Sequence, residues 1–111
     1  MTTETTEVPR EAFGSQLAAL RAAVALADQF PQFEPAYLTF SQHYPDQVNI
    51  QAESFVALEA WREALGAAPV LVHSREIGPD VELYFEAPAF GATIRVYAMG
   101  LVVSDATAVA A

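Results

Sequence analysis

The stretch VELYFEAPAFGATIRVYAM, residues 81–99, decides the fold. Apolar residues alternate with polar or aromatic ones on both sides of Gly91, which predicts two strands that each bury one face. Pro88 and Gly91 bracket a turn, so we expect the two strands to form a hairpin. The residues predicted to face inward are Val81, Leu83, Phe85, Ala87, Ala92, Ile94, Val96 and Ala98.

The outward side of this hairpin is the candidate functional surface. Tyrosine, methionine and arginine are enriched at protein interfaces, and all three lie on this side. We also expect ion pairs between its glutamates and arginines of neighbouring strands. Plain exposure to water remains the alternative, because antiparallel sheets commonly leave one face in solvent. The predicted interaction residues are Tyr84, Tyr97, Arg95, Met99, Glu82 and Glu86.

Further strands are predicted on both sides of this hairpin. Residues 70–77 form a strand that ends at the turn Gly78-Pro79-Asp80. Residues 36–41 and 47–51 alternate in the same way and are joined by a turn at residues 44–47. Residues 100–104 are expected to add a short edge strand.

Two helices are predicted. The first spans residues 9–28, and the second runs from residue 54 to the stop at Gly66, with Phe55, Leu58, Trp61 and Leu65 facing inward. The rest of the first helix is mostly alanine, so we expect either a plain core helix or one that a second subunit approaches closely. Its predicted apolar stripe is Phe13, Leu17, Leu20, Val24 and Ala27.

The elements therefore follow the order α-β-β-α-β-β-β. Short links favour antiparallel pairing, so we predict an α+β two-layer sandwich whose mostly antiparallel sheet carries both helices on one face. The 111 residues have room for one core. We expect a disordered leader at residues 1–8, one domain at 9–104 and a flexible tail at 105–111.

The second helix carries a family resemblance. The segment FVALEAWREALG, residues 55–66, is entered from a strand and followed by strand–turn–strand. In this it resembles small uncharacterised actinobacterial and actinophage accessory proteins, which are often found in plasmid, prophage or phage regions. The resemblance implies an accessory protein of a bacterium or mobile element, and it brings no activity, cofactor or catalytic residue with it.

Charge and composition narrow the partners. The formal net charge is −9, and the five basic residues are all scattered arginines, which argues against direct binding to nucleic acid or anionic lipid. Cysteine is absent, which excludes disulfides and thiolate sites. The N-terminus has no signal-peptide pattern, and the longest apolar run is interrupted by polar residues. We therefore expect a cytoplasmic protein.

No motif for catalysis emerges. His73 and Ser74 are neighbours on a predicted strand, so they point to opposite faces. Glu82 and Glu86 would lie about 13 Å apart along one strand, which is too far for a glycosidase pair. His73, Glu76 and Asp80 could bind a metal, but nothing brings them to one centre, and His43 lies alone beside a turn. We expect no enzyme, metal or cofactor.

The sequence favours a non-enzymatic protein-interaction module that forms a homo-oligomer and binds another protein. One alternative is an acidic mimic of nucleic acid, which blocks a DNA- or RNA-binding protein. The other is a small-molecule-binding domain with a pocket lined by Tyr37, His43, Trp61 and His73. The mimic would require one acidic patch made of Glu53, Glu59, Glu63, Glu76, Glu82 and Glu86.

Overall fold

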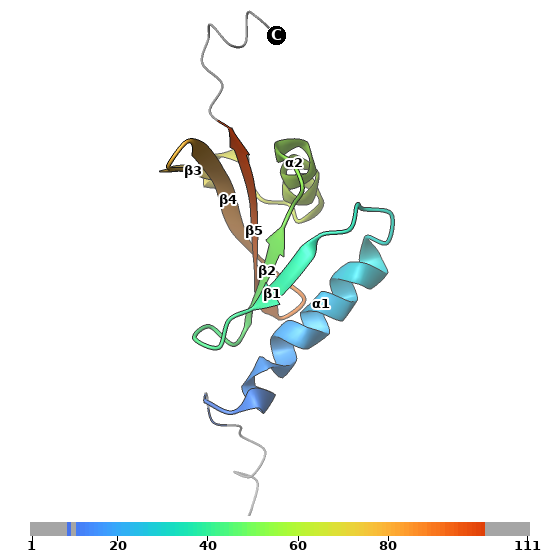
Figure 1. The fold of residues 1–111 in the computed structure, drawn as a ribbon. Helices are drawn as coiled ribbons and strands as arrows, with labels where there is room; N and C mark the ends of the chain where they lie inside the picture. The colour runs from blue at the N-terminus through green and yellow to red at the C-terminus, as the bar shows by residue number, and fades with distance from the viewer. Residues whose placement is uncertain (1–8, 10, 102–111) are drawn as a thin grey trace, which may run out of the picture.

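The computed structural model describes residue 9 and residues 11–101, with only the backbone at residue 101. Within this part, helices and strands follow the predicted order (Figure 1). Two short 3-10 helices are added to it. The elements are η2 (Phe13–Gln16), α1 (Leu17–Gln29), β1 (Tyr37–Phe40), β2 (Gln47–Gln51), α2 (Phe55–Ala64), η3 (Pro69–Leu71), β3 (His73–Ile77), β4 (Asp80–Ala89) and β5 (Ala92–Leu101).

The strands form one five-stranded sheet in the order β1-β2-β5-β4-β3. Three neighbouring pairs are antiparallel, whereas β2 and β5 run parallel. The predicted α+β fold with a mostly antiparallel sheet is therefore confirmed, but the parallel pair was not predicted. It arises because α2, β3 and β4 lie between β2 and β5 in the chain, which gives the long crossover that parallel neighbours need.

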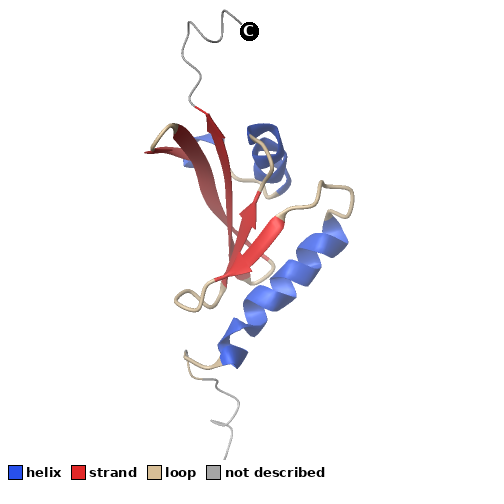
Figure 2. Cartoon of the chain, in the orientation of Figure 1, coloured by secondary structure: helices blue, strands red, loops and turns tan. Residues whose placement is uncertain are grey.

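Both helices cover the same face of this sheet, as predicted (Figure 2). α1 packs on β2 and β5, and α2 packs on β4 and β5. The side chains beneath the helices come from alternate strand positions and form a continuous apolar row, because Val48 and Ile50 lie beside Ile94 and Val96, and Val96 faces Phe85. The largest fully buried side chains are Phe85, Ile50, Leu58, Ile94, Val48 and Val96.

The first helix turns a different side to the sheet from the one predicted. Its buried residues are Ala19, Ala22 and Leu26. Alanine side chains let the helix axis approach the strands closely, so the side with larger residues is left outside. The helix also starts later than predicted, at Leu17 after the 3-10 turn η2. All residues of the predicted inward stripe are exposed: Phe13, Leu17, Leu20, Val24 and Ala27.

The second helix matches its prediction closely. The Ser54 hydroxyl accepts a hydrogen bond from the Ala57 backbone N–H at 3.0 Å, which caps the first turn. Gly66 follows the helix with φ +72°, a conformation that glycine adopts without steric cost. Leu58 and Trp61 are buried, and Phe55 and Leu65 pack beside them.

Several strand boundaries differ from the predictions, and β1 is shorter than expected by one residue at each end. Residues 69–71 form η3, so β3 begins only at His73. Pro88 lies inside β4, where β3 no longer pairs with that strand, so its missing N–H leaves no ladder bond unmade. Gly100 and Leu101 continue β5 and form no separate strand, while the rest of the predicted edge strand lies outside the described residues.

The predicted leader at 1–8 and tail at 105–111 also lie outside the described residues. In the part of the chain that is described, no helix has the length and apolar character that crossing a membrane requires. The described segment thus consists of one sheet with α1 and α2 on one side and a second face that neither of them covers (Figure 2).

Candidate functional site

The sheet face opposite the helices is called the outer face here. Its side chains alternate with the buried ones, and the strand register brings them into rows across all five strands. Neither α1 nor α2 packs on this face. It comprises Tyr37, Thr39, Gln47, Asn49, Gln51, His73, Arg75, Ile77, Asp80, Glu82, Tyr84, Glu86, Pro88, Thr93, Arg95, Tyr97 and Met99.

The six residues predicted as an interaction surface lie together on the outer face. They lie on β4 and β5, which form the longest strand pair of the sheet. This juxtaposition follows from the hairpin between the strands, whose two-residue turn, Phe90–Gly91, has positive φ at both positions. The directly opposite pairs are Glu82 with Met99, Tyr84 with Tyr97, and Glu86 with Arg95.

Arg95 lies at the centre of this group. Its guanidinium carbon is 4.8 Å from the ring centroid of Tyr84 and 5.4 Å from that of Tyr97, so both rings contribute cation–π attraction. Its side chain is only 23% exposed. Among the described residues it forms only loose ion pairs, at 3.7 Å with Glu82 and 3.9 Å with Glu86, and no hydrogen bond. The planar guanidinium of Arg95 is thus held in place, while its N–H donors remain available to a binding partner.

Glu82 is the buried carboxylate of the outer face, at 5% exposure. Arg75 of β3 donates a hydrogen bond to it at 3.1 Å, and Arg95 of β5 approaches the same oxygen from the other side. The predicted ion pairs between these glutamates and arginines are therefore present. These ion pairs were expected to be exposed to solvent. Glu82 is buried instead, because the long arginine side chains on both neighbouring strands cover it.

A shallow polar hollow of about 410 Å³ adjoins Arg95. Its other walls come from β1, β2 and the loop between them, and no pattern in the sequence predicted them. The alternation in residues 47–51 predicts only a strand, and the parallel pairing, which was not predicted, places Asn49 beside Arg95. The hollow is lined by Thr39, Ser41, Tyr44, Gln47, Asn49, Glu82, Arg95 and Tyr97.

The two histidines do not assemble a reactive centre. His73 lies on the outer face with its ring centroid 5.4 Å from that of Tyr84, whereas Ser74 is directed to the opposite face. His43 lies in the loop before β2, where its backbone N–H donates to the Ser41 hydroxyl. Residues 11–101 contain no group of three histidine, aspartate or glutamate side chains that could hold a metal ion.

Two apolar cavities lie on the other side of the sheet, beside the loop between α1 and β1. They measure about 260 and 400 Å³ and share Phe33, Glu34 and Trp61 as lining residues. Trp61 also makes edge-on contacts with Phe30 and Phe33. Of the pocket residues predicted for a small molecule, only Trp61 lines either of these described cavities.

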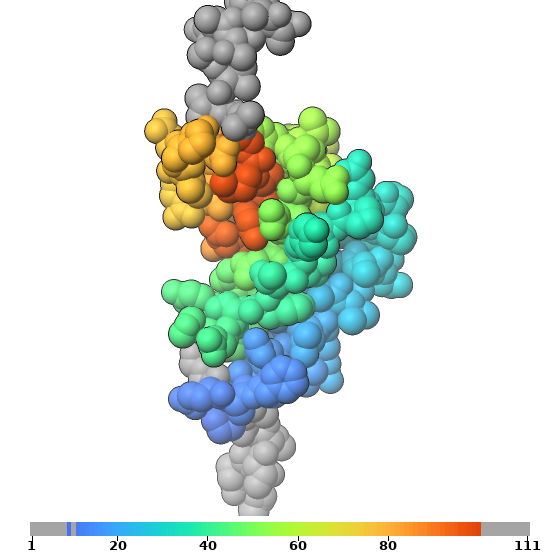
Figure 3. Space-filling model, in the orientation of Figure 1, coloured from blue at the N-terminus to red at the C-terminus, as the bar shows by residue number. Residues whose placement is uncertain are grey.

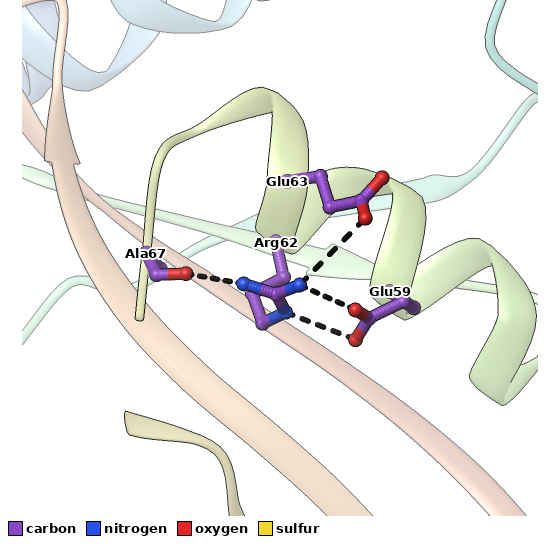
Figure 4. Close-up of polar contacts among 4 residues, drawn as sticks. All are labelled: Glu59, Arg62, Glu63 and Ala67. Carbon is purple, nitrogen blue, oxygen red and sulfur yellow. Dashed lines mark hydrogen bonds and ion pairs between the residues drawn. The ribbon is translucent and has the colours of Figure 1, made fainter. Parts of the chain in front are cut away.

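The acidic residues considered for a nucleic-acid mimic are distributed over both sides of the sheet. Glu59 and Glu63 belong to α2, where both pair with Arg62 (Figure 4). Glu82 and Glu86 lie on the outer face and pair with arginines there. Comparisons with protein-family models, curated proteins and solved structures find no match to this chain. What the chain can bind is therefore inferred from its own side chains.

Proposed function

We propose that this chain is a non-enzymatic protein-interaction module that binds another protein through its outer face. The observation that carries the proposal is Arg95, whose guanidinium lies over the rings of Tyr84 and Tyr97 and makes no hydrogen bond to any described residue. Arginine and tyrosine are the residue types that dominate interface energetics, and a preordered guanidinium loses little entropy on binding.

The composition of the outer face favours protein over nucleic acid as the partner. Its two arginines are matched by Glu82 and Glu86, so it offers no excess positive charge to a phosphate backbone. Its tyrosines, amides and methionine suit a partner surface that offers apolar groups and carbonyl acceptors. The resemblance of α2 to actinobacterial and actinophage accessory proteins supports a modulator or adaptor role in such a setting.

Capture from a nuclease-treated actinobacterial lysate, read by mass spectrometry, tests the proposal. Wild-type protein and Arg95→Lys are compared, because lysine keeps the charge but loses the planar fork of donors. We expect one stoichiometric partner on the wild type and a loss of about tenfold or more on Arg95→Lys. The matched control is Arg21→Lys. Arg21 is an exposed residue on α1, so this variant should capture as much of the partner as the wild type does.

Other outcomes would overturn the proposal. Equal capture by Arg95→Lys and wild type would move the binding surface away from the outer face. A captured DNA- or RNA-binding protein that free DNA displaces would favour the acidic mimic. Recovery of the bait alone would favour the second candidate, a binder of small apolar ligands at Trp61, which the two apolar cavities support.

A further inference from the structure

The side of α1 that points away from the sheet carries a row of apolar residues that the described part of the chain leaves open to solvent. Leu17, Leu20 and Val24 are 47%, 38% and 70% exposed, and the exposed Ala27 continues the row. The residues that α1 buries against the sheet lie on its opposite side. The spacing of three and four residues is that of a seam along which one helix packs against another. Figure 3 shows α1, in blue, along one side of the molecule.

The same side of the helix carries one residue of each charge. Arg21 and Asp28 are the only charged residues of α1, and both are exposed. They are seven residues apart, which is two helical turns, so they lie next to the apolar row on either side of Val24 along the axis. Because about 10 Å of helix separates them, they do not pair with each other, and neither forms an ion pair with another described residue.

We propose that this side of α1 binds its counterpart in a second copy of the chain, with the two helices antiparallel about a two-fold axis near Val24. Arg21 of each copy then lies beside Asp28 of the other, and the symmetry forms this ion pair twice. Charges that flank an apolar seam decide which helices pair and in which direction. A parallel pair would instead place each of these charges beside its own copy, which is repulsive.

The apolar row fits the same arrangement. Leu20 of one helix reaches the interval between Val24 and Ala27 of the other, so a larger side chain meets smaller ones. α1 lies on the outside of the fold, with the sheet behind it (Figure 2). Two copies can therefore meet helix to helix with their sheets on the far sides, and the outer face of each sheet remains free for another partner.

The size of this contact predicts its strength. α1 has 13 residues, which makes it about 20 Å long. Pairing along that length would bury roughly 500 Å² per copy, and the total of about 1,000 Å² is near the lower limit for a specific interface. We therefore expect a reversible dimer with a dissociation constant in the micromolar range.

Charge reversal tests the pairing of Arg21 with Asp28. Sedimentation equilibrium of the full chain between roughly 5 and 500 μM should show the wild-type mass rising from 12.0 kDa toward twice that value. Arg21→Asp and Asp28→Arg each place like charges together twice, so each should weaken the dimer by about tenfold or more. The double variant Arg21→Asp/Asp28→Arg should recover the wild-type dissociation constant. The single variants change the net charge in opposite directions and the double variant leaves it unchanged, so net charge alone does not produce this pattern.

A second variant tests the apolar row. Val24→Glu would bury a carboxylate near the axis in both copies and should stay monomeric up to the highest concentration. The matched control Val70→Glu adds the same charge at a valine of η3 that is 81% exposed and lies outside the row, so it should dimerise as the wild type does. Both valines are exposed, so both variants should keep the wild-type circular dichroism spectrum.

A wild type that stays monomeric across the series, a Val24→Glu protein that still dimerises, or a double reversal as weak as the single ones would overturn the proposal. Arg95→Lys should leave the dimer intact, because the outer face lies on the opposite side of the sheet from α1. Arg21→Lys keeps the positive charge and therefore the dimer, so it remains a control for capture through the outer face. The dimer and the proposed function thus fail independently.

Discussion

At the residue scale, Glu82 shows how the outer face is held together. It is the only charged side chain that is buried among the described residues. A buried carboxylate is tolerated when charged donors replace its lost water, and here Arg75 and Arg95 take that role from the two neighbouring strands. By holding Arg95 loosely at 3.7 Å, Glu82 also helps to orient the guanidinium that we propose as the binding anchor.

Replacing this carboxylate should destabilise the fold measurably. Glu82→Gln keeps the shape but removes the charge, and we expect a loss of about 1.5–3 kcal/mol in the free energy of unfolding, the usual worth of a hydrogen bond to a charged group. Urea denaturation measures the loss. The control Glu86→Gln should cost less than about 0.5 kcal/mol, because Glu86 is exposed and its ion pair is long. Equal losses would contradict the role given to Glu82.

At the element scale, α2 shows how one side chain can close a helix end. Arg62 donates from Nε to Glu59 at 2.9 Å and from Nη1 to the Ala67 carbonyl at 2.6 Å, and it also pairs with Glu63 (Figure 4). It thereby connects the last turns of the helix to the chain beyond Gly66. The hydrogen bond from Arg62 lowers the pKa of Glu59 below its ordinary value.

This shift gives the stability of the fold a pH dependence of known sign. Because the pKa of Glu59 is lower in the folded state, its contribution is complete above the unfolded value of 4.5 and is lost as pH falls through the folded value. We expect Glu59→Gln to lower the melting temperature at about pH 7, and we expect its difference from wild type to shrink as pH falls below 4.5 and through the lower folded value. Thermal unfolding across this range measures it, and a difference that persists at low pH would contradict the assignment.

At the scale of the whole molecule, the parallel pairing of β2 with β5 joins the N-terminal unit α1-β1-β2 to the hairpin of β4 and β5. Ile50 and Val96 meet at this junction, and both are fully buried. Both helices also pack on β5, so the junction and the helical layer depend on the same strand. The two parts of the chain should therefore unfold together.

Truncation of the Ile50 side chain tests whether the two parts unfold together. We expect Ile50→Ala to cost about 2–5 kcal/mol, because the cavity would lie in the centre of the core. Unfolding should remain a single transition, with Trp61 fluorescence and far-ultraviolet circular dichroism changing together. The control Val70→Ala, at an exposed valine, should stay within about 0.5 kcal/mol of wild type. Separate transitions for the two signals would show that the halves are independent.

Much of the fold could be predicted from local patterns. The alternation in residues 81–99 separated inner from outer side chains on β4 and β5, and so it placed all six predicted interaction residues on one face. The helix signals of α2 were equally clear, because Ser54 and Gly66 mark its two ends. The first helix was read wrongly, since its sequence offers two apolar sides and periodicity alone does not say which one packs.

The sequence by itself determined the element order and the two faces of the central hairpin, because spacing along one strand or helix sets which side chains share a side. Only the tertiary structure decided the parallel neighbour of β5, the burial of Glu82 and the polar hollow beside Arg95. It also decided that α1 buries its alanines and leaves its larger residues in water. These features arise from contacts between residues far apart in the chain, and the energy of such contacts depends on how closely the elements can approach, which no local pattern records.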